Sequence, residues 1–280
     1  MINKWIITGD THGRVNERLL HILKHQNNNL RDTGVIILGD AGFNFYLNKT
    51  DAKVKRTVNK HGIYIYCVRG NHEERPRNIA SMRLILDENV QNYVYYEPQY
   101  PFIRYFLDGA LYRLVDGERT YRTLVIGGAY SVDKWFRVTH YRASGKIFDE
   151  DNIPGWFCRE QLSESERLAI SRCWSGAKVD LVLTHTCPLS WQPTDLFIRG
   201  LDQSTVDNSM EVWLEELKDS IEWDLWLFGH YHDDRLVRPH VEMFYTDYEW
   251  LSTISERWAP GAETVWWLKK DPNYFIDEGV

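Results

Sequence analysis

The chain has 280 residues, of which 43% are hydrophobic and 26% are charged, a composition typical of globular proteins that bury a substantial core. Its formal net charge is -7 and its pI is near 5.8. We therefore expect no broad basic surface for nonspecific binding of nucleic acid or membranes. No apolar run reaches the length of about 18 residues that a membrane-spanning helix needs, so we expect no membrane segment.

Four cysteines are present, without Cys-x-x-Cys spacing: Cys67, Cys158, Cys173 and Cys187. Cys67 lies within an apolar run, where a reduced thiol behaves as a small hydrophobic side chain. The first residues enter a strand-like run directly, with no targeting segment. These features predict a reducing compartment and a cytoplasmic protein.

The first 72 residues alternate between strand and helix patterns. Apolar residues at Val15, Leu19 and Ile22 follow helical spacing. In chain order, we expect strands over 5–8, 35–38 and 63–68, and helices over 15–26 and 50–60. Such βαβ units gather the carboxyl ends of their strands at one edge of a sheet, where ligands bind.

The middle of the chain has a weaker pattern. We expect short antiparallel strands at 93–96 and 102–106, between prolines and glycines, and another strand at 123–126. Residues 128–158 are rich in aromatic side chains and too long for a simple connection. We interpret this segment as a loop over a functional site, with a structural excursion packed on the surface as the alternative.

The last part of the chain begins with Ser163-x-x-Glu166, a capping-box pattern that predicts a helix from 163 to about 174. A second long loop is expected over 188–208, before a helix over 209–220. The remaining expected strands are 181–183, 225–228, 235–237, 242–245 and 264–268. Because no repeat or linker interrupts the chain, we expect one domain over 1–280, with the loops 128–158 and 188–208 near the site.

Five of the expected strands end in side chains that can bind a divalent metal. The strand ends are Gly9-Asp10-Thr11-His12-Gly13, Gly39-Asp40, Gly70-Asn71-His72-Glu73, Thr184-His185 and Gly229-His230-Tyr231-His232. Seven of these residues are candidate ligands: Asp10, His12, Asp40, Asn71, His185, His230 and His232. Seven ligands are too many for one ion and suit two ions that share a bridging carboxylate.

The mixture of imidazole and carboxylate favours Mn, Fe or Zn over Ca. Two such ions, about 3.5 to 4 Å apart, can hold a bridging hydroxide as nucleophile and neutralise a phosphoryl group during in-line displacement. The pattern therefore predicts hydrolysis of a phosphoester.

In these five motifs, in their order and over residues 5–232, the chain resembles the calcineurin-like metallophosphoesterases, which include the Ser/Thr phosphoprotein phosphatases. Two loop phrases, 127–133 and 202–207, are similar to poorly characterised bacterial and phage members. The resemblance implies an α/β fold, a four-layer αββα sandwich of two mixed β-sheets flanked by helices. It places a dinuclear metal site at the carboxyl-terminal edge of the strands.

The resemblance also implies how the ligands are shared between two divalent or mixed-valence ions. One ion is held by Asp10, His12, Asp40 and His232. The other is held by Asp40, Asn71, His185 and His230, with Asp40 as the bridge. His72 stays off the metals and protonates the leaving oxygen, a role that suits imidazole near neutral pH.

One motif departs from the pattern of several branches of the family. Those branches have Gly-Asp-x-x-Asp-Arg-Gly, in which the second Asp orients the acid His and the Arg contacts phosphate. This chain has Phe43 and Asn44 at those two positions. The candidates for the phosphate contact are Arg69, Arg75, Arg199 and the Asp133-Lys134 pair. We include Arg69 with His72 and Asp40 as a catalytic candidate, a salt bridge at the sheet edge being the alternative role for Arg69.

The first functional hypothesis is a phosphatase that hydrolyses a phosphomonoester, on a small molecule or a phosphoprotein. The second is a phosphodiesterase or nuclease of the same fold. The acidity of the chain counts against a long nucleic acid as substrate. A third hypothesis, a metal-binding scaffold without catalysis, is disfavoured because all ligands and His72 are present. Trp213, Trp223 and Trp226 fit core positions, whereas Trp135, Trp156 and Trp191 are candidates to line a substrate cleft.

Overall fold

The computed structural model describes residues 1–27, 29–197 and 204–259. The strand expected over 264–268 lies outside the described residues, as do Arg199 and Asp202 of the second long loop.

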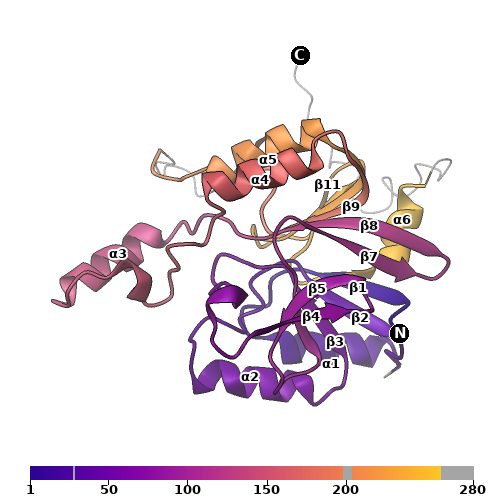
Figure 1. The fold of residues 1–280 in the computed structure, drawn as a ribbon, viewed down its shortest axis with the longest axis horizontal. Coiled ribbons are helices and arrows are strands. Elements are labelled where there is room, and N and C mark those ends of the chain that lie inside the picture. The colour runs from indigo at the N-terminus through magenta and orange to yellow at the C-terminus, as the bar shows by residue number, and fades with distance from the viewer. Residues whose placement is uncertain (28, 198–203, 260–280) are drawn as a thin grey trace.

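The chain forms two mixed β-sheets that pack face to face and are flanked by helices (Figure 1). The seven-stranded sheet has the order β13 (Tyr248–Trp250), β1 (Lys4–Thr8), β2 (Thr33–Ile37), β3 (Tyr64–Cys67), β6 (Ile103–Tyr105), β5 (Asn92–Tyr96) and β4 (Arg83–Asp87). The six-stranded sheet has the order β11 (Arg235–Arg238), β12 (Val241–Met243), β10 (Glu222–Phe228), β9 (Lys178–Thr184), β8 (Arg119–Ile126) and β7 (Ala110–Asp116). The expectation of two mixed sheets is confirmed.

Helices cover the outer faces of both sheets. The helices α1 (Val15–His25) and α2 (Lys49–Asn59) lie against the seven-stranded sheet, and α4 (Glu164–Trp174) and α5 (Ser209–Ser220) against the six-stranded sheet (Figure 1). A short helix, α6 (Leu251–Arg257), follows β13 and contacts β1. The layers are therefore helix, sheet, sheet and helix.

Successive side chains of a strand point to opposite faces of its sheet, and in the central strands both faces are buried. Ile7 and Ile36 point into the core between the sheets, while Ile6, Val35 and Ile37 pack under α1 and α2. Because both faces of a central parallel strand are covered, every position favours an apolar residue.

The central strands run parallel. β1 pairs with β2 and β2 with β3 in one sheet, and β8 pairs with β9 and β9 with β10 in the other. The carboxyl ends of these strands consequently meet at one edge of the sandwich, as expected from the βαβ pattern.

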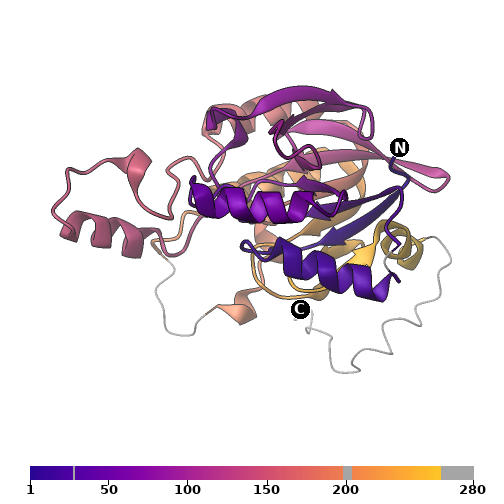
Figure 2. The same ribbon diagram turned by 90° about the horizontal axis from the view of Figure 1, so that it is seen from below.

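Residues 128–158 form an arm that projects from the body of the protein (Figures 1 and 2). The arm contains α3 (Lys134–Ala143) and a short 3₁₀ helix, η2 (Glu150–Asn152), and it has a small core of Val138, Ile153 and Trp156. The sequence predicts a loop here, whereas the structure contains the helix α3. Only Val138 of the helix is buried, so its sequence has no broad apolar stripe.

The tryptophans follow the sequence predictions in part. Trp213 and Trp226 are buried, as expected for core residues. Trp156 and Trp191 are also buried, in the arm and beneath the six-stranded sheet respectively, and so do not line an open cleft. Trp135 is exposed on α3. None of the helices in the described part of the chain is long and apolar enough to span a membrane.

Ser163 and Glu166 form the expected capping box at the start of α4, and Glu166 also accepts hydrogen bonds from Arg75 and Arg77. Burial favours the neutral carboxyl, but the bonds from Arg75 and Ser163 outweigh it and lower the pKa of Glu166 to about 2. Since the ordinary pKa is near 4.5, this carboxylate stabilises the fold above that pH, and its contribution is lost as the pH falls towards 2.

We therefore expect Glu166→Gln to lower the free energy of unfolding at pH 7 by about 1 to 2 kcal/mol. The difference from the wild type should shrink as the pH falls from about 4.5 towards 2. Urea unfolding at several pH values measures both effects. Glu164→Gln, an exposed change in the same helical turn, is the control and should cost less than about 1 kcal/mol. Equal losses of stability in the two variants would contradict this account of the hydrogen bonds that Glu166 makes with Ser163 and Arg75.

Candidate metal centre

The seven candidate ligands follow the carboxyl ends of parallel strands in both sheets. Asp10, Asp40 and Asn71 come after β1, β2 and β3, while His185 and His230 come after β9 and β10. Asp10, Asp40, Asn71 and His185 are almost completely buried, and His12 and His232 lie nearer the surface. The sandwich thus brings together side chains more than 200 residues apart in sequence, such as Asp10 and His232.

One group consists of Asp10, His12 and His232. His232 Nε2 lies 3.5 Å and His12 Nε2 3.9 Å from Asp10 Oδ2, and the two ring nitrogens are 2.8 Å apart. Asp10 Oδ2 is buried and has no hydrogen-bond partner among the described residues. Burial of an unpaired carboxylate oxygen is costly, so this arrangement fits a cation between the three side chains.

A second, deeper group contains Asp40, Asn71 and His185. In the neutral form, which is the one that binds metals, His185 carries its proton on Nδ1, because the carbonyl oxygen of Leu38, 2.8 Å away, can only accept a hydrogen bond. His185 Nε2 then offers a lone pair, yet it faces Asn71 Oδ1 at 2.8 Å and Asp40 Oδ2 at 3.7 Å. Three electron-rich atoms facing one another in a buried site fit a bound metal ion.

His230 joins this group through its ring, whose centre is 4.9 Å from that of His185. Burial lowers its pKa well below the ordinary value, and the neighbouring His185 adds to the effect. The neutral imidazole favoured here is the form that binds metals. Its backbone N–H donates to Asp10 Oδ1 at 3.2 Å, which ties the two groups together.

The backbone at this edge is strained. Four candidate ligands have a left-handed backbone, with φ of 45° at His12, 43° at Asp40, 72° at His230 and 56° at His232. Such conformations cost about 1 to 3 kcal/mol each in a non-glycine residue and cluster at functional sites. The strain supports a functional role for this edge.

Glycines precede several ligands because the site leaves no room for a side chain. A Cβ atom at Gly39 would overlap the ring of His185, and one at Gly70 would overlap the carboxylate of Asp40. Glycine at these two positions is therefore required by the close approach of neighbouring strand ends.

His72 lies beside the ligands. Its backbone N–H donates to Asp40 Oδ1 at 2.8 Å, and its ring centre is 5.9 Å from that of His12 and 6.2 Å from that of Phe45. Its Nδ1 is buried without a hydrogen-bond partner among the described residues. Phe43 and Asn44, the two positions at which the motif departs from the Gly-Asp-x-x-Asp-Arg-Gly pattern, are both buried. In the described structure, no carboxylate takes the place of the missing Asp.

The described candidates for a phosphate contact are engaged within the protein. Arg69 is buried, and its guanidinium binds Asp108 and the carbonyl oxygens of Gly127 and Glu160. Arg75 binds Glu166 and two carbonyl oxygens, and Lys134 lies over the ring of Trp156. Contact of Arg69 with phosphate stays a prediction, and its observed bonds brace the chain.

Three residues around the site were not singled out by the sequence analysis. Glu73 accepts from the N–H groups of Gly42 and Phe43, and its place in Gly-Asn-His-Glu could have pointed to it. Ser131 and Glu160 lie behind Asn71. Burial raises the pKa of Glu160 to about 7, although the bonds from Ser131 favour its carboxylate. No spacing in the sequence links Glu160 to Asn71.

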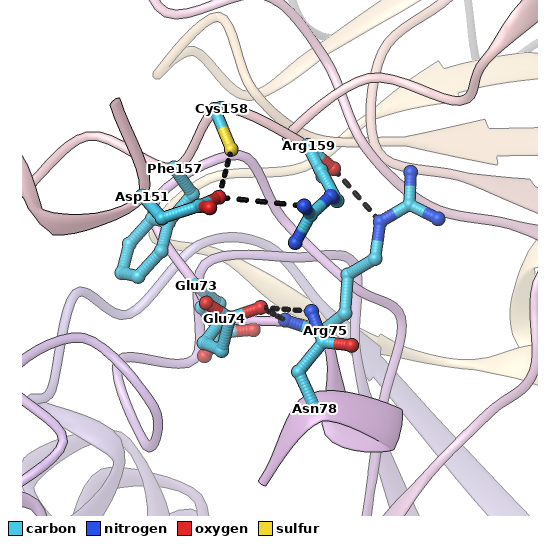
Figure 3. Close-up of a pocket in the computed structure, with 8 residues that line it drawn as sticks. All are labelled: Glu73, Glu74, Arg75, Asn78, Asp151, Phe157, Cys158 and Arg159. Atoms are coloured by element: carbon cyan, nitrogen blue, oxygen red, sulfur yellow. Dashed lines mark hydrogen bonds and ion pairs between the residues drawn. The ribbon is translucent and has the colours of Figure 1, made fainter. Parts of the chain in front are cut away.

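A small cavity of about 130 Å³ opens next to this edge, beside Glu73. Figure 3 shows Asp151 bonded to Cys158 and Arg159, and Arg75 bonded to the carbonyl oxygen of Arg159. None of the seven candidate ligands lines the cavity. It is a neighbour of the metal centre and separate from it.

The sequence model of the calcineurin-like phosphoesterases matches residues 4–234, which include every candidate ligand. The chain belongs to this family. The match confirms the resemblance and supports a metal-dependent phosphoesterase. No curated protein matches the chain. Among the solved structures that match, one crystal structure is 13% identical and covers 90% of this chain and 95% of its own, at a TM-score of 0.41.

The close approach at Gly70 leads to a prediction. In Gly70→Ala the new methyl group would push the Asp40 carboxylate away, so Mn²⁺ binding should weaken by at least about tenfold. Isothermal titration calorimetry measures this change. The control is Gly117→Ala, where a Cβ meets nothing within 4 Å, and which should cost stability, about 1 kcal/mol, without changing Mn²⁺ affinity. Wild-type affinity in Gly70→Ala would show that the tight packing is not needed.

Proposed function

We propose that this calcineurin-like phosphoesterase hydrolyses a phosphomonoester with two bound metal ions. The observation that carries the proposal is the buried convergence of Asp10, Asp40 and His185, two carboxylates and an imidazole whose ligand atoms lie within 4.8 Å of one another. Two buried carboxylates this close repel each other unless a cation lies near both.

The donor set fits Mn, Fe or Zn. In the proposed arrangement, Asp40 bridges an ion held by Asp10, His12 and His232 and an ion held by Asn71, His185 and His230. Asp10, His12 and His232 form one compact group in the structure. Asp40 and His185 lie together in a second group, with Asp10. When bound, the ions would activate water and neutralise the charge of the phosphoryl group.

His72 is proposed as the general acid that protonates the leaving oxygen. Its backbone bond to Asp40 anchors it at the metal centre, and its ring lies near those of His12 and Phe45. Packing against these rings replaces the carboxylate that orients the corresponding histidine in related proteins. Imidazole is suited to proton transfer near neutral pH.

The arm favours a phosphodiester as the second candidate substrate. Helix α3 has no acidic residue, and it exposes the rings of Trp135 and Phe136 together with Arg142. Aromatic rings and cations on one element are suited to stacking with bases and contact with phosphates of a single strand. The described cysteines are all free, which supports our further proposal of a reducing, cytoplasmic location.

Hydrolysis of p-nitrophenyl phosphate and bis-p-nitrophenyl phosphate, with Mn, Fe, Zn or Mg supplied, tests the proposal. We expect preference for the monoester and loss of activity in Asp40→Asn. Preference for the diester would favour the second candidate. If neither ester is hydrolysed with any metal, the non-catalytic scaffold becomes the better account.

His72→Ala should lower kcat by about 10²- to 10⁴-fold with a poor leaving group such as phenol. The loss should be smaller with p-nitrophenol, because this leaving group departs as an anion and depends less on protonation. His25→Ala, an exposed change on α1, is the control and should retain wild-type kcat. Equal losses with both leaving groups would argue against the acid role.

A further inference from the structure

We propose that Glu160 is a positioning residue for the metal centre, and that it acts through Ser131 to fix which end of the Asn71 amide faces His185. The inference rests on the proposed function, in which Asn71 is a metal ligand. Its basis is a chain of hydrogen bonds behind the ligand, on the side away from the metal site.

The chain of bonds is short and buried. Asn71 Nδ2 donates to Ser131 Oγ at 2.8 Å, and Ser131 Oγ donates to Glu160 Oε2 at 2.5 Å. The backbone N–H of Ser131 donates to the other oxygen, Glu160 Oε1, at 2.9 Å. The exposed fractions are 1% for Asn71, 1% for Ser131 and 3% for Glu160. Such buried polar groups are held in one arrangement by their partners.

The direction of these bonds determines the orientation of the amide. In its ionised form, which the two bonds from Ser131 favour, Glu160 can only accept, so it takes the hydroxyl hydrogen of Ser131. The Ser131 oxygen then presents only lone pairs to Asn71, and only the N–H end of the amide can face it. The carbonyl end, Asn71 Oδ1, is consequently turned towards His185 Nε2, 2.8 Å away.

Glu160 thereby excludes a competing arrangement. Without a fixed acceptor, the Ser131 hydroxyl can donate to Asn71 Oδ1 and let the amide turn over. The turned amide would direct its N–H group at the lone pair of His185 Nε2, which is favourable without metal. It would also remove an oxygen donor from the site. Orientation by such outer hydrogen bonds typically changes metal affinity by about 10- to 100-fold.

Arg69 holds Glu160 in place. Its Nη1 donates to the backbone oxygen of Glu160 at 2.6 Å, Nη2 to the oxygen of Gly127 at 3.0 Å, and Nε to Asp108 at 2.9 Å. Arg69 is itself two residues before Asn71 and two residues after the last residue of β3, Cys67. Ser131 and Glu160 are 29 residues apart and form the two roots of the arm. The buried guanidinium therefore joins Gly127 and Glu160, which lie on either side of the arm, to the segment that carries the ligand.

Calorimetric titration of the metal-free full chain with Mn²⁺ tests the inference. The wild type should bind two ions. In Glu160→Gln the new NH₂ group cannot accept a hydrogen bond, so one of the two bonds from Ser131 is lost. The Kd of one Mn²⁺ ion should then rise by about 10- to 100-fold, while the Kd of the other ion stays unchanged. Ser131→Ala removes the hydroxyl link and should act in the same direction. Glu150→Gln, an exposed change in the arm, should leave both Kd values unchanged.

A double-mutant cycle separates positioning from general damage to the fold. In an Asn71→Ala background, Glu160→Gln should change the remaining Kd by less than about twofold, because the group that it positions is absent. The same loss in both backgrounds would overturn the inference, as would wild-type binding by both Glu160→Gln and Ser131→Ala.

If Glu160→Gln does not fold, as judged by thermal unfolding, Ser131→Ala decides. Wild-type protein that binds no Mn²⁺ would overturn the proposed function and the inference with it, whereas two-ion binding unchanged by the variants overturns the inference alone.

Discussion

The arrangement of the whole sheet edge depends on the crowding of electron-rich atoms around Asp10, Asp40 and His185. These side chains are buried, where repulsion between them is only weakly screened. Closely spaced strand ends are needed to bring them together, and this spacing requires glycine at Gly39 and Gly70 and a left-handed backbone at four ligands. The two packed sheets supply the rigidity that holds such strained residues in one arrangement.

Much of the fold could be predicted from the sequence because the central strands are covered on both faces. Their continuous apolar runs end at glycine, and helices with clear apolar spacing lie between them, as in α1 between β1 and β2. Helix α3 could not be predicted in this way, because most of its side chains face solvent and only Val138 is buried. The edge strand β4 was missed for a related reason: most of its residues are partly or fully exposed.

In the site, residues within one short motif could be predicted from the sequence, whereas partners far apart in the sequence could not. The candidate ligands were found because each lies within a short motif at a strand end, where type and spacing are visible together. The support from Glu160 was not visible, since its partners Ser131 and Asn71 are 29 and 89 residues away. Arg69 illustrates the ambiguity that remains in a motif: a cation beside Gly-Asn-His suggests a phosphate contact, which stays a prediction, while the bonds of its buried guanidinium to Asp108, Gly127 and Glu160 brace the chain.

The roots of the arm meet beneath Asn71, and this position has a thermodynamic consequence. Any molecule that binds the arm and shifts Ser131 relative to Glu160 must also change the affinity of the centre for metal. Linkage makes the effect reciprocal, so that metal binding changes the affinity of the arm for that molecule by the same factor. On the proposed role of Glu160, the projecting helix and the buried edge are coupled through the hydroxyl of Ser131 and the carboxylate of Glu160.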